Sequence, residues 1–164
     1  MKTRQLIFTA ISFNLIVAVI MIVSMFGLDG LEFLVELPLN ILVALIGLYS
    51  CGFYIEKNIE NTIQRSPKYA AITGASALFL ILATATFLGS SVGFIQEGIL
   101  QSHQEYTIQN AIFDYYFKPF FWIFLMGFMP TLIVGIILGL FIKTNLKNKT
   151  ATNSAVKQAL DFSG

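Results

Sequence analysis

Residues Leu6 to Leu28 read LIFTAISFNLIVAVIMIVSMFGL, a run of 23 residues without a charged side chain. A helix rises about 1.5 Å per residue, so this run reaches about 34 Å and can cross a hydrocarbon core of about 30 Å. A cleaved signal peptide has a shorter apolar core, of about 7–15 residues, and ends at small residues. This run ends at Asp29-Gly30 without an Ala-x-Ala pattern. We therefore expect an uncleaved membrane-spanning helix over 6–28.

The composition of the whole chain also predicts a membrane protein. Of its 164 residues, 56% are hydrophobic and 12% are charged, and the mean hydropathy is +0.76. Soluble domains carry about 25% charged residues. The net charge of +1 offers no basic surface for nucleic acid. A soluble globular, disordered or fibrous protein is excluded, and the lipid bilayer is the first expected partner.

Three further apolar runs are long enough to span: 37–55, 70–95 and 120–142. Pro38 is tolerated at the start of the second run, and Ser66-Pro67 supplies an N-cap and a first-turn proline before the third. Pro130 lies inside the fourth run, where it removes one backbone hydrogen bond and predicts a kink. The expected fold class is all-α, a polytopic membrane protein with four transmembrane helices over residues 1–142.

The basic residues predict the orientation of these helices. With a cytoplasmic N-terminus, the inner segments carry nine of them: Lys2, Arg4, Lys57, Arg65, Lys68, Lys143, Lys147, Lys149 and Lys157. The outer segments carry only Lys118. Because Lys and Arg counts in short loops decide topology, we expect both termini in the cytoplasm of a multi-pass protein in the cell inner (plasma) membrane.

Two polar segments lie outside the spans. In residues 96–119, apolar residues recur at spacings of three and four, which predicts an outer amphipathic helix. Such a helix commonly lies in the headgroup region and covers the bundle. The alternative is a docking surface for a partner. Residues 143–164 are polar and are expected to form a loose cytoplasmic tail.

Polar residues within the spans are expected to join helices. They include Asn14, Asn40, Thr84 and Ser91. An amide in hydrocarbon requires a partner, and interhelical hydrogen bonds satisfy this requirement. A ligand-binding role for Asn14 is the alternative. No acidic or basic residue lies in the central part of any span, which argues against a proton-coupled carrier because such proteins place ionisable groups there.

Small residues recur every four positions in three spans and predict close helix packing. The glycines among them are Gly89, Gly93, Gly127, Gly135 and Gly139. Small residues let helix backbones approach each other in a membrane. The pattern leaves open whether these faces pack within the chain or against another protein.

The outer segment also holds His103, Glu97, Glu105 and Asp114, which form a weak candidate for a metal or acid–base site. His103 and Glu105 are two residues apart, so a helix would place them on different faces. A solvated polar face is the simpler interpretation. Cys51 is the single cysteine, the sequence holds no hydrolase, metalloprotease or P-loop motif, and no segment resembles a known family motif. No catalytic residue, metal or cofactor is predicted.

These observations lead to one functional expectation and two alternatives. The expected function is a non-catalytic accessory or scaffold subunit of a larger membrane complex, which binds other membrane proteins, or itself, through its glycine faces and its outer amphipathic helix. The first alternative is a small subunit or homo-oligomeric pore of a transport system for ions or small solutes, lined by the hydroxyl-rich third span. The second is a membrane enzyme that uses His103 and the outer carboxylates on a lipid headgroup.

Overall fold

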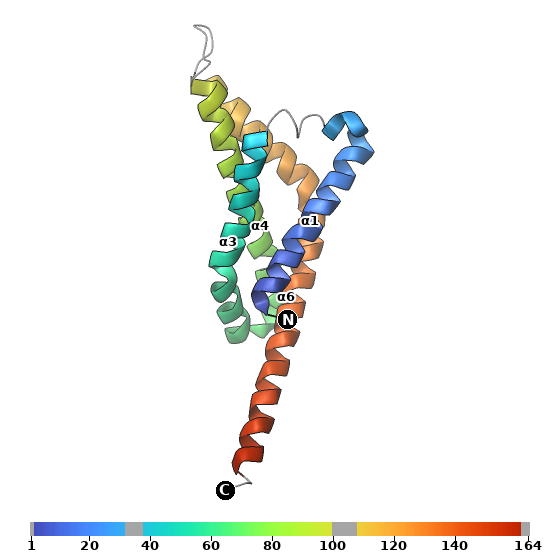
Figure 1. Ribbon diagram of the computed structural model, residues 1–164, viewed down its shortest axis with the longest axis vertical. Helices are drawn as coiled ribbons and strands as arrows, with labels where there is room; N and C mark the ends of the chain where they lie inside the picture. Colours follow the sequence, from blue (N-terminus) through green and yellow to red (C-terminus); the bar gives the residue numbers. More distant parts are fainter. Residues whose placement is uncertain (1, 32–37, 100–107, 162–164) are drawn as a thin grey trace.

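The computed structural model describes residues 2–31, 38–99 and 108–161, and these residues form an all-α bundle without strands. Four helical segments are long and apolar enough to cross a membrane: Thr3–Phe26, Pro38–Arg65, Pro67–Gln96 and Ile108–Lys149. The predicted fold class is therefore confirmed, and the chain is a multi-pass membrane protein. Both termini lie at the same end of the bundle (Figure 1).

The first two spans begin and end where local chemistry requires it. Helix α1 covers Thr3–Phe26 and ends at Gly27, whose N–H donates to the carbonyl of Val23 at 2.9 Å. Gly27 has a φ of +69°, a left-handed conformation that glycine adopts without steric cost. A short 3-10 turn, η1, follows at Leu28–Leu31. Helix α3 covers Pro38–Arg65 and starts at the predicted proline.

The third and fourth spans are compound helices. The 3-10 turn η2 (Pro67–Tyr69) leads into α4 (Ala70–Gly93), and the π-helix η3 (Phe94–Ile99) extends it. The last span begins with α5 (Ile108–Ile112) and the π-helix η4 (Phe113–Phe117) and continues as α6 (Lys118–Asp161). Ser66 precedes η2 as predicted, but its side chain makes no capping hydrogen bond.

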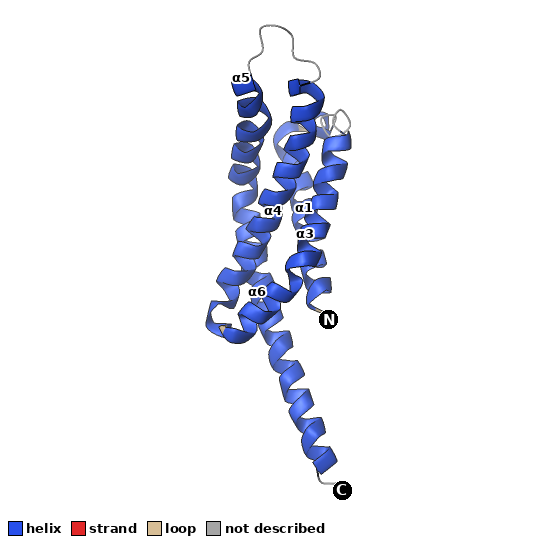
Figure 2. Cartoon of the chain, turned by 90° about the vertical axis from the view of Figure 1, so that its left-hand side faces the viewer, coloured by secondary structure: helices blue, strands red, loops and turns tan. Residues whose placement is uncertain are grey.

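The outer segment is arranged differently from a helix lying across the bundle. Its described parts, η3 at one end and α5 with η4 at the other, run on from α4 and α6 and pack against each other (Figure 2). Tyr116 explains this arrangement, because its ring packs on Phe87 and Phe94 and its hydroxyl donates to Ser91 at 3.0 Å. The aromatic residues of the segment thus join the α4–α6 interface.

The tail after Lys143 also differs from the expectation of a loose segment, because α6 continues to Asp161. The stretch holds no proline or glycine before Gly164, and its Lys, Ala, Leu and Gln residues favour a helix. Leu146 is buried, and Lys149 lies 4.0 Å from Glu60 of α3. These contacts support the first turns beyond the span, and the helix then projects past the bundle (Figure 1).

The hydrophobic core lies in the half of the bundle that carries the termini, which we call the closed end. All four helices contribute buried side chains there, with Ile7, Ile63, Ile81 and Ile142 the largest that are fully buried. Polar contacts add to this packing: Thr3 donates to Glu60 at 2.9 Å, and the backbone N–H of Arg4 donates to Glu56 at 3.1 Å. With the contact of Lys149 to Glu60, the carboxylates of α3 thus join α1, α3 and α6 at the closed end.

Candidate functional site: an apolar cleft between α1 and α6

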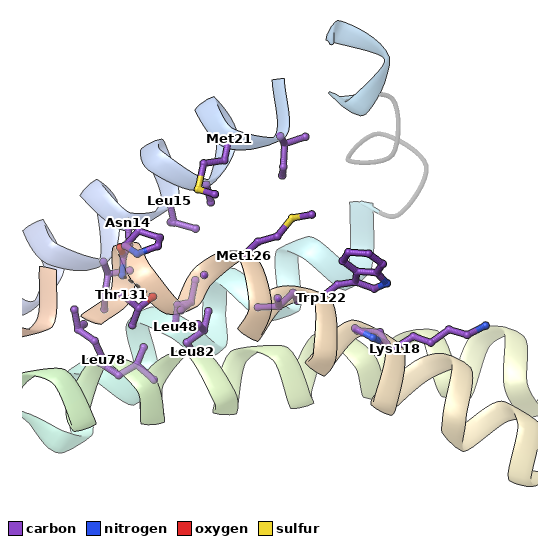
Figure 3. A pocket seen from close by; sticks show the side chains of 18 of the residues that line it. Asn14, Leu15, Met21, Leu48, Leu78, Leu82, Lys118, Trp122, Met126 and Thr131 are labelled. Atoms are coloured by element: carbon purple, nitrogen blue, oxygen red, sulfur yellow. Dashed lines mark hydrogen bonds between the residues drawn. The ribbon is translucent and has the colours of Figure 1, made fainter. Parts of the chain in front are cut away.

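At the opposite end, which we call the open end, α1 leans away from the other helices (Figure 1). The separation leaves a cleft of about 940 Å³ whose walls come mainly from α1 and α6. Leu15 and Met21 line one wall, and Met126 and Trp122 line the other (Figure 3). Ligand pockets in proteins commonly hold about 300–1,000 Å³, so the cleft has the size of a binding site.

The floor of the cleft is a polar contact between α1 and α6. The amide nitrogen of Asn14 donates to the hydroxyl of Thr131 at 3.3 Å (Figure 3). Thr131 is 3% exposed, and the carbonyl oxygen of Asn14 is buried without a hydrogen-bond partner. The predicted intramembrane amide therefore joins two helices at the point where the cleft closes, and it keeps one acceptor unsatisfied.

Two residues of α6, Pro130 and Gly127, help to keep the cleft open. Pro130 lies inside α6, where it removes a backbone donor, and above it α6 turns toward α4 while α1 leans the other way (Figure 1). Gly127 adds space, because a Cβ at this position would meet only Leu82 at 3.4 Å and Thr131 at 3.9 Å. This glycine lines the cleft, and no backbone of another helix lies within 4 Å of the Cβ position.

Charged and amphipathic residues surround the mouth of the cleft. Asp29 follows α1, and Asp114 and Lys118 lie at the start of the last span. The ammonium of Lys118 forms an ion pair with the carboxylate of Asp114. Trp122 lies one turn below Lys118 and is 53% exposed. The mouth thus offers two carboxylates, one ammonium and one indole N–H above an apolar interior.

The remaining predicted glycines lie in contacts within the chain. A Cβ on Gly135 would lie 2.5 Å from the Cα of Ala75, and a Cβ on Gly139 would overlap the carbonyl oxygen of Ala70. Gly89 lies against Ala44, and Gly93 lies against Asn40 and Tyr115. These four positions are buried. The faces expected to meet either the same chain or a partner are therefore occupied by α3, α4, η4 and α6.

The hydroxyls of the third span are satisfied locally. Thr84 donates to the carbonyl of Leu80 at 2.8 Å, and Ser91 donates to the carbonyl of Phe87 at 2.8 Å. Asn40 at the head of α3 is half-buried, and its side-chain oxygen is buried without a hydrogen-bond partner. These residues lie outside the cleft lining. The structure therefore brings together Asn14 and Thr131 but not the other polar candidates.

The candidate outer site falls mainly outside the described part of the chain. His103 and Glu105 lie outside the described residues, and so does the side chain of Glu97. Asp114 is in η4 and pairs with Lys118. Within the described ranges, no three His, Cys, Asp or Glu side chains gather in a way that would hold a metal ion. The described geometry assembles no acid–base site from these residues.

A second exposed feature is a row of phenylalanine rings on η4 and α6, which we call the aromatic face. It consists of Phe113, Phe117, Phe120, Phe121 and Phe124. Phe113 stacks on Phe117, and Phe120 stacks on Phe124, with centroids 4.9 Å and 5.9 Å apart. The last four rings surround a shallow hollow of about 270 Å³. This hollow has the volume of one large side chain.

Sequence reasoning missed three features that the structure shows. Gly74 is the residue of α4 that contacts Gly135 and Gly139. Ala70 and Gly74 are small residues four positions apart, and this spacing could have indicated the contact. The contacts of Glu60 with Thr3 and Lys149 were also missed. The cleft carries no sequence signal, because its lining residues come from separate helices at irregular spacing.

Comparison with protein-family models, curated proteins and solved structures finds no match to this chain.

Proposed function

We propose that this chain is a non-catalytic accessory subunit of a larger complex in the cell inner membrane. It binds a transmembrane helix of a partner protein through the aromatic face. The observation that carries the proposal is the exposure of this face. Phe117 and Phe121 are 59% and 53% exposed, and the face is ordered by the stacked pairs Phe113–Phe117 and Phe120–Phe124. Aromatic side chains supply much of the binding energy at protein interfaces.

The glycine contacts support this choice of surface. Gly135 and Gly139 lie against α4, so a partner helix does not have access to them. The aromatic face remains available, and its hollow among Phe117, Phe120, Phe121 and Phe124 accepts one side chain of a facing helix. Insertion of a side chain into a hole formed by four residues is the usual geometry of helix packing.

The pore alternative has less support from the same geometry. A pore-lining stripe needs polar groups directed toward a shared channel, but Thr84 and Ser91 donate to carbonyls of their own helix. The cleft between α1 and α6 is lined mainly by apolar side chains. An apolar cavity favours binding of apolar groups over passage of ions.

Site-specific photo-crosslinking in native membranes tests the proposal. A photoreactive phenylalanine analogue at Phe121 is expected to yield one discrete protein adduct, because Phe121 is exposed on the aromatic face that the partner helix would contact. The matched control carries the analogue at Ile20, which is 58% exposed on α1, and is expected to yield none. Lipid adducts alone at Phe121, together with migration of the native protein at the size of the chain itself, would reject the proposal.

The paired variant Phe117→Ala/Phe121→Ala adds a second measurement. We expect it to lose co-migration with the larger complex and to keep its thermal unfolding temperature, since both side chains are largely exposed. Ile16→Ala/Ile20→Ala is the control and should change neither. Single-channel currents from the purified chain in liposomes, abolished by bulky substitutions at Thr84 or Ser91, would favour the pore instead.

A further inference from the structure

We propose that the cleft between α1 and α6 holds one phospholipid from the leaflet at the open end, and that the headgroup carries both a phosphate and a primary ammonium. This proposal goes beyond the accessory function and concerns a different surface. The depth, volume, lining and charge of the cleft all support a lipid as its occupant.

The depth of the cleft matches one leaflet of a bilayer. Lys118 lies at the mouth and Thr131 at the floor, and this separation of 13 residues on α6 corresponds to about 20 Å of helix. Half of a hydrocarbon core measures about 15 Å. Ile11 of α1 still lines the inner end of the cleft, and Ile7, one turn further along α1, is fully buried in the core. An acyl chain from one leaflet therefore reaches the floor and stops there.

The volume of the cleft favours a lipid over a helix. A spanning helix is a cylinder of about 10 Å diameter and about 30 Å length, and so fills about 2,400 Å³. The cleft offers about 940 Å³ and ends at the Asn14–Thr131 contact. A methylene group fills roughly the volume of a water molecule, about 30 Å³. Two acyl chains of about 16 carbons each therefore fit the cleft, whereas a complete spanning helix is too large for it.

The lining suits flexible hydrocarbon. Met21 and Met126 lie on opposite walls with Leu15 and Leu82 (Figure 3). Methionine side chains are unbranched and adapt to irregular apolar shapes. Each buried methylene of a lipid chain contributes about 0.8 kcal/mol relative to water, but bulk lipid offers the same environment. Selection of one lipid must therefore come from the mouth of the cleft.

The mouth is complementary to a headgroup that carries both signs of charge. Asp29 lies at the end of α1, and the Asp114–Lys118 ion pair lies across from it on η4 and α6. A primary ammonium is attracted by the carboxylate of Asp29, and a phosphate is attracted by Lys118. A headgroup that carries only negative charge meets the repulsion of two carboxylates. The indole N–H of Trp122 supplies a donor for an ester or phosphate oxygen.

Native mass spectrometry of the purified chain tests the assignment. With phosphatidylethanolamine we expect a saturable adduct of one lipid per chain, and with phosphatidylglycerol about tenfold less adduct at equal concentration. Phosphatidylcholine keeps the charges but lacks the N–H donors, and we expect it to fall between the two. Equal retention of all three lipids, or several equivalent adducts per chain, would overturn the headgroup assignment.

Two variants separate the cleft from the rest of the lipid-facing surface. Gly127→Leu fills the cleft without a backbone clash and should lower the phosphatidylethanolamine adduct about tenfold. Leu125→Phe adds bulk at a side chain that is 59% exposed and outside the cleft lining, and should leave the adduct unchanged. An unchanged adduct in Gly127→Leu would place the lipid elsewhere and reject the proposal.

Trp122, the single tryptophan of the chain, gives an independent readout. In detergent, phosphatidylethanolamine with brominated acyl chains should quench its fluorescence with saturation at one lipid per chain, and Gly127→Leu should abolish the saturable part. Asp29→Asn should reduce the preference for phosphatidylethanolamine over phosphatidylglycerol. If Gly127→Leu abolishes co-migration with a larger complex while no lipid adduct forms in the unaltered chain, the cleft holds a protein segment and the lipid proposal is wrong.

Discussion

The α4–α6 contact at the closed end and the boundary between α1 and α6 at the open end differ in the size of the side chains between the two helices. At the closed end, Gly74, Gly135 and Gly139 let the backbones of α4 and α6 touch. At the open end, Met21 and Met126 stand between α1 and α6, and the cleft remains. In a membrane the hydrophobic effect does not drive helices together, so van der Waals contact decides their separation. Small residues thus hold α4 against α6, whereas larger side chains leave a surface between α1 and α6 that binding could use.

The largest expected effect is an all-or-none difference in cysteine labelling, which tests which end of the bundle faces the cell exterior. In a Cys51→Ser background, we expect His103→Cys to react with a membrane-impermeant maleimide added to intact cells, because the basic residues predict that this segment is external. Lys147→Cys at the other end should react only after the membrane is opened. Reversal of these two labelling patterns would contradict the predicted orientation of both ends.

The largest stability effect is expected at the glycine contact of the closed end. Gly139→Leu should destabilise the fold by about 3 kcal/mol or prevent folding, because its side chain must displace the backbone of α4. Gly127→Leu makes the same substitution at the open end and should be nearly neutral. Unfolding in detergent measures both variants. Equal unfolding temperatures would show that the two ends do not differ in tightness.

A smaller effect is expected from the charged contacts of the closed end. Glu60→Gln keeps the shape of the side chain but weakens its hydrogen bond from Thr3 and its attraction to Lys149. We expect a loss of about 1 kcal/mol, since Glu60 is partly exposed. Lys57→Gln on the exposed side of the same helix is the control. A loss as large in the control as in Glu60→Gln would argue against a specific contact.

The smallest effect is expected at the boundary between the two ends. A double-mutant cycle with Asn14→Leu and Thr131→Val should give a coupling free energy of about 0.6 kcal/mol, the average for interhelical hydrogen bonds in membranes. Asn14→Leu alone should cost little, because the amide already has an unsatisfied oxygen. A coupling near zero would show that the contact does not hold α1 to α6.

The four spans were predictable because each is a long apolar run between polar or charged segments. The run 6–28 and the start at Pro38 agree with α1 and α3. Residues beyond the spans were harder to predict, since α6 continues to Asp161 and its contact with α3, Lys149 to Glu60, depends on how the helices are arranged. For the outer segment, periodicity predicts a helix but does not show that Tyr116 joins it to α4.

The candidate site was predictable only at single residues. Asn14 was recognised because an amide in hydrocarbon requires a partner, but Thr131 as that partner depends on how α1 crosses α6. The glycine pattern predicts close approach but not the residues that meet, and the structure places Gly135 against the backbone of Ala75 and Gly127 at the cleft, near the side chain of Leu82. A cavity forms where side chains of different helices do not contact each other, and the residue pattern of a single helix does not predict this.

The continuity of α6 has a mechanical consequence. From Pro130 to Asp161 the chain is one helix of 31 further residues, a rod of about 46 Å. Gly135, Gly139 and Ile142 hold the first part of this rod against the other helices. The residues after Lys149 extend about 18 Å further, so any tilt of the packed part carries Asp161 with it. This end of α6 projects beyond the bundle, where such a displacement is accessible to other molecules (Figure 1).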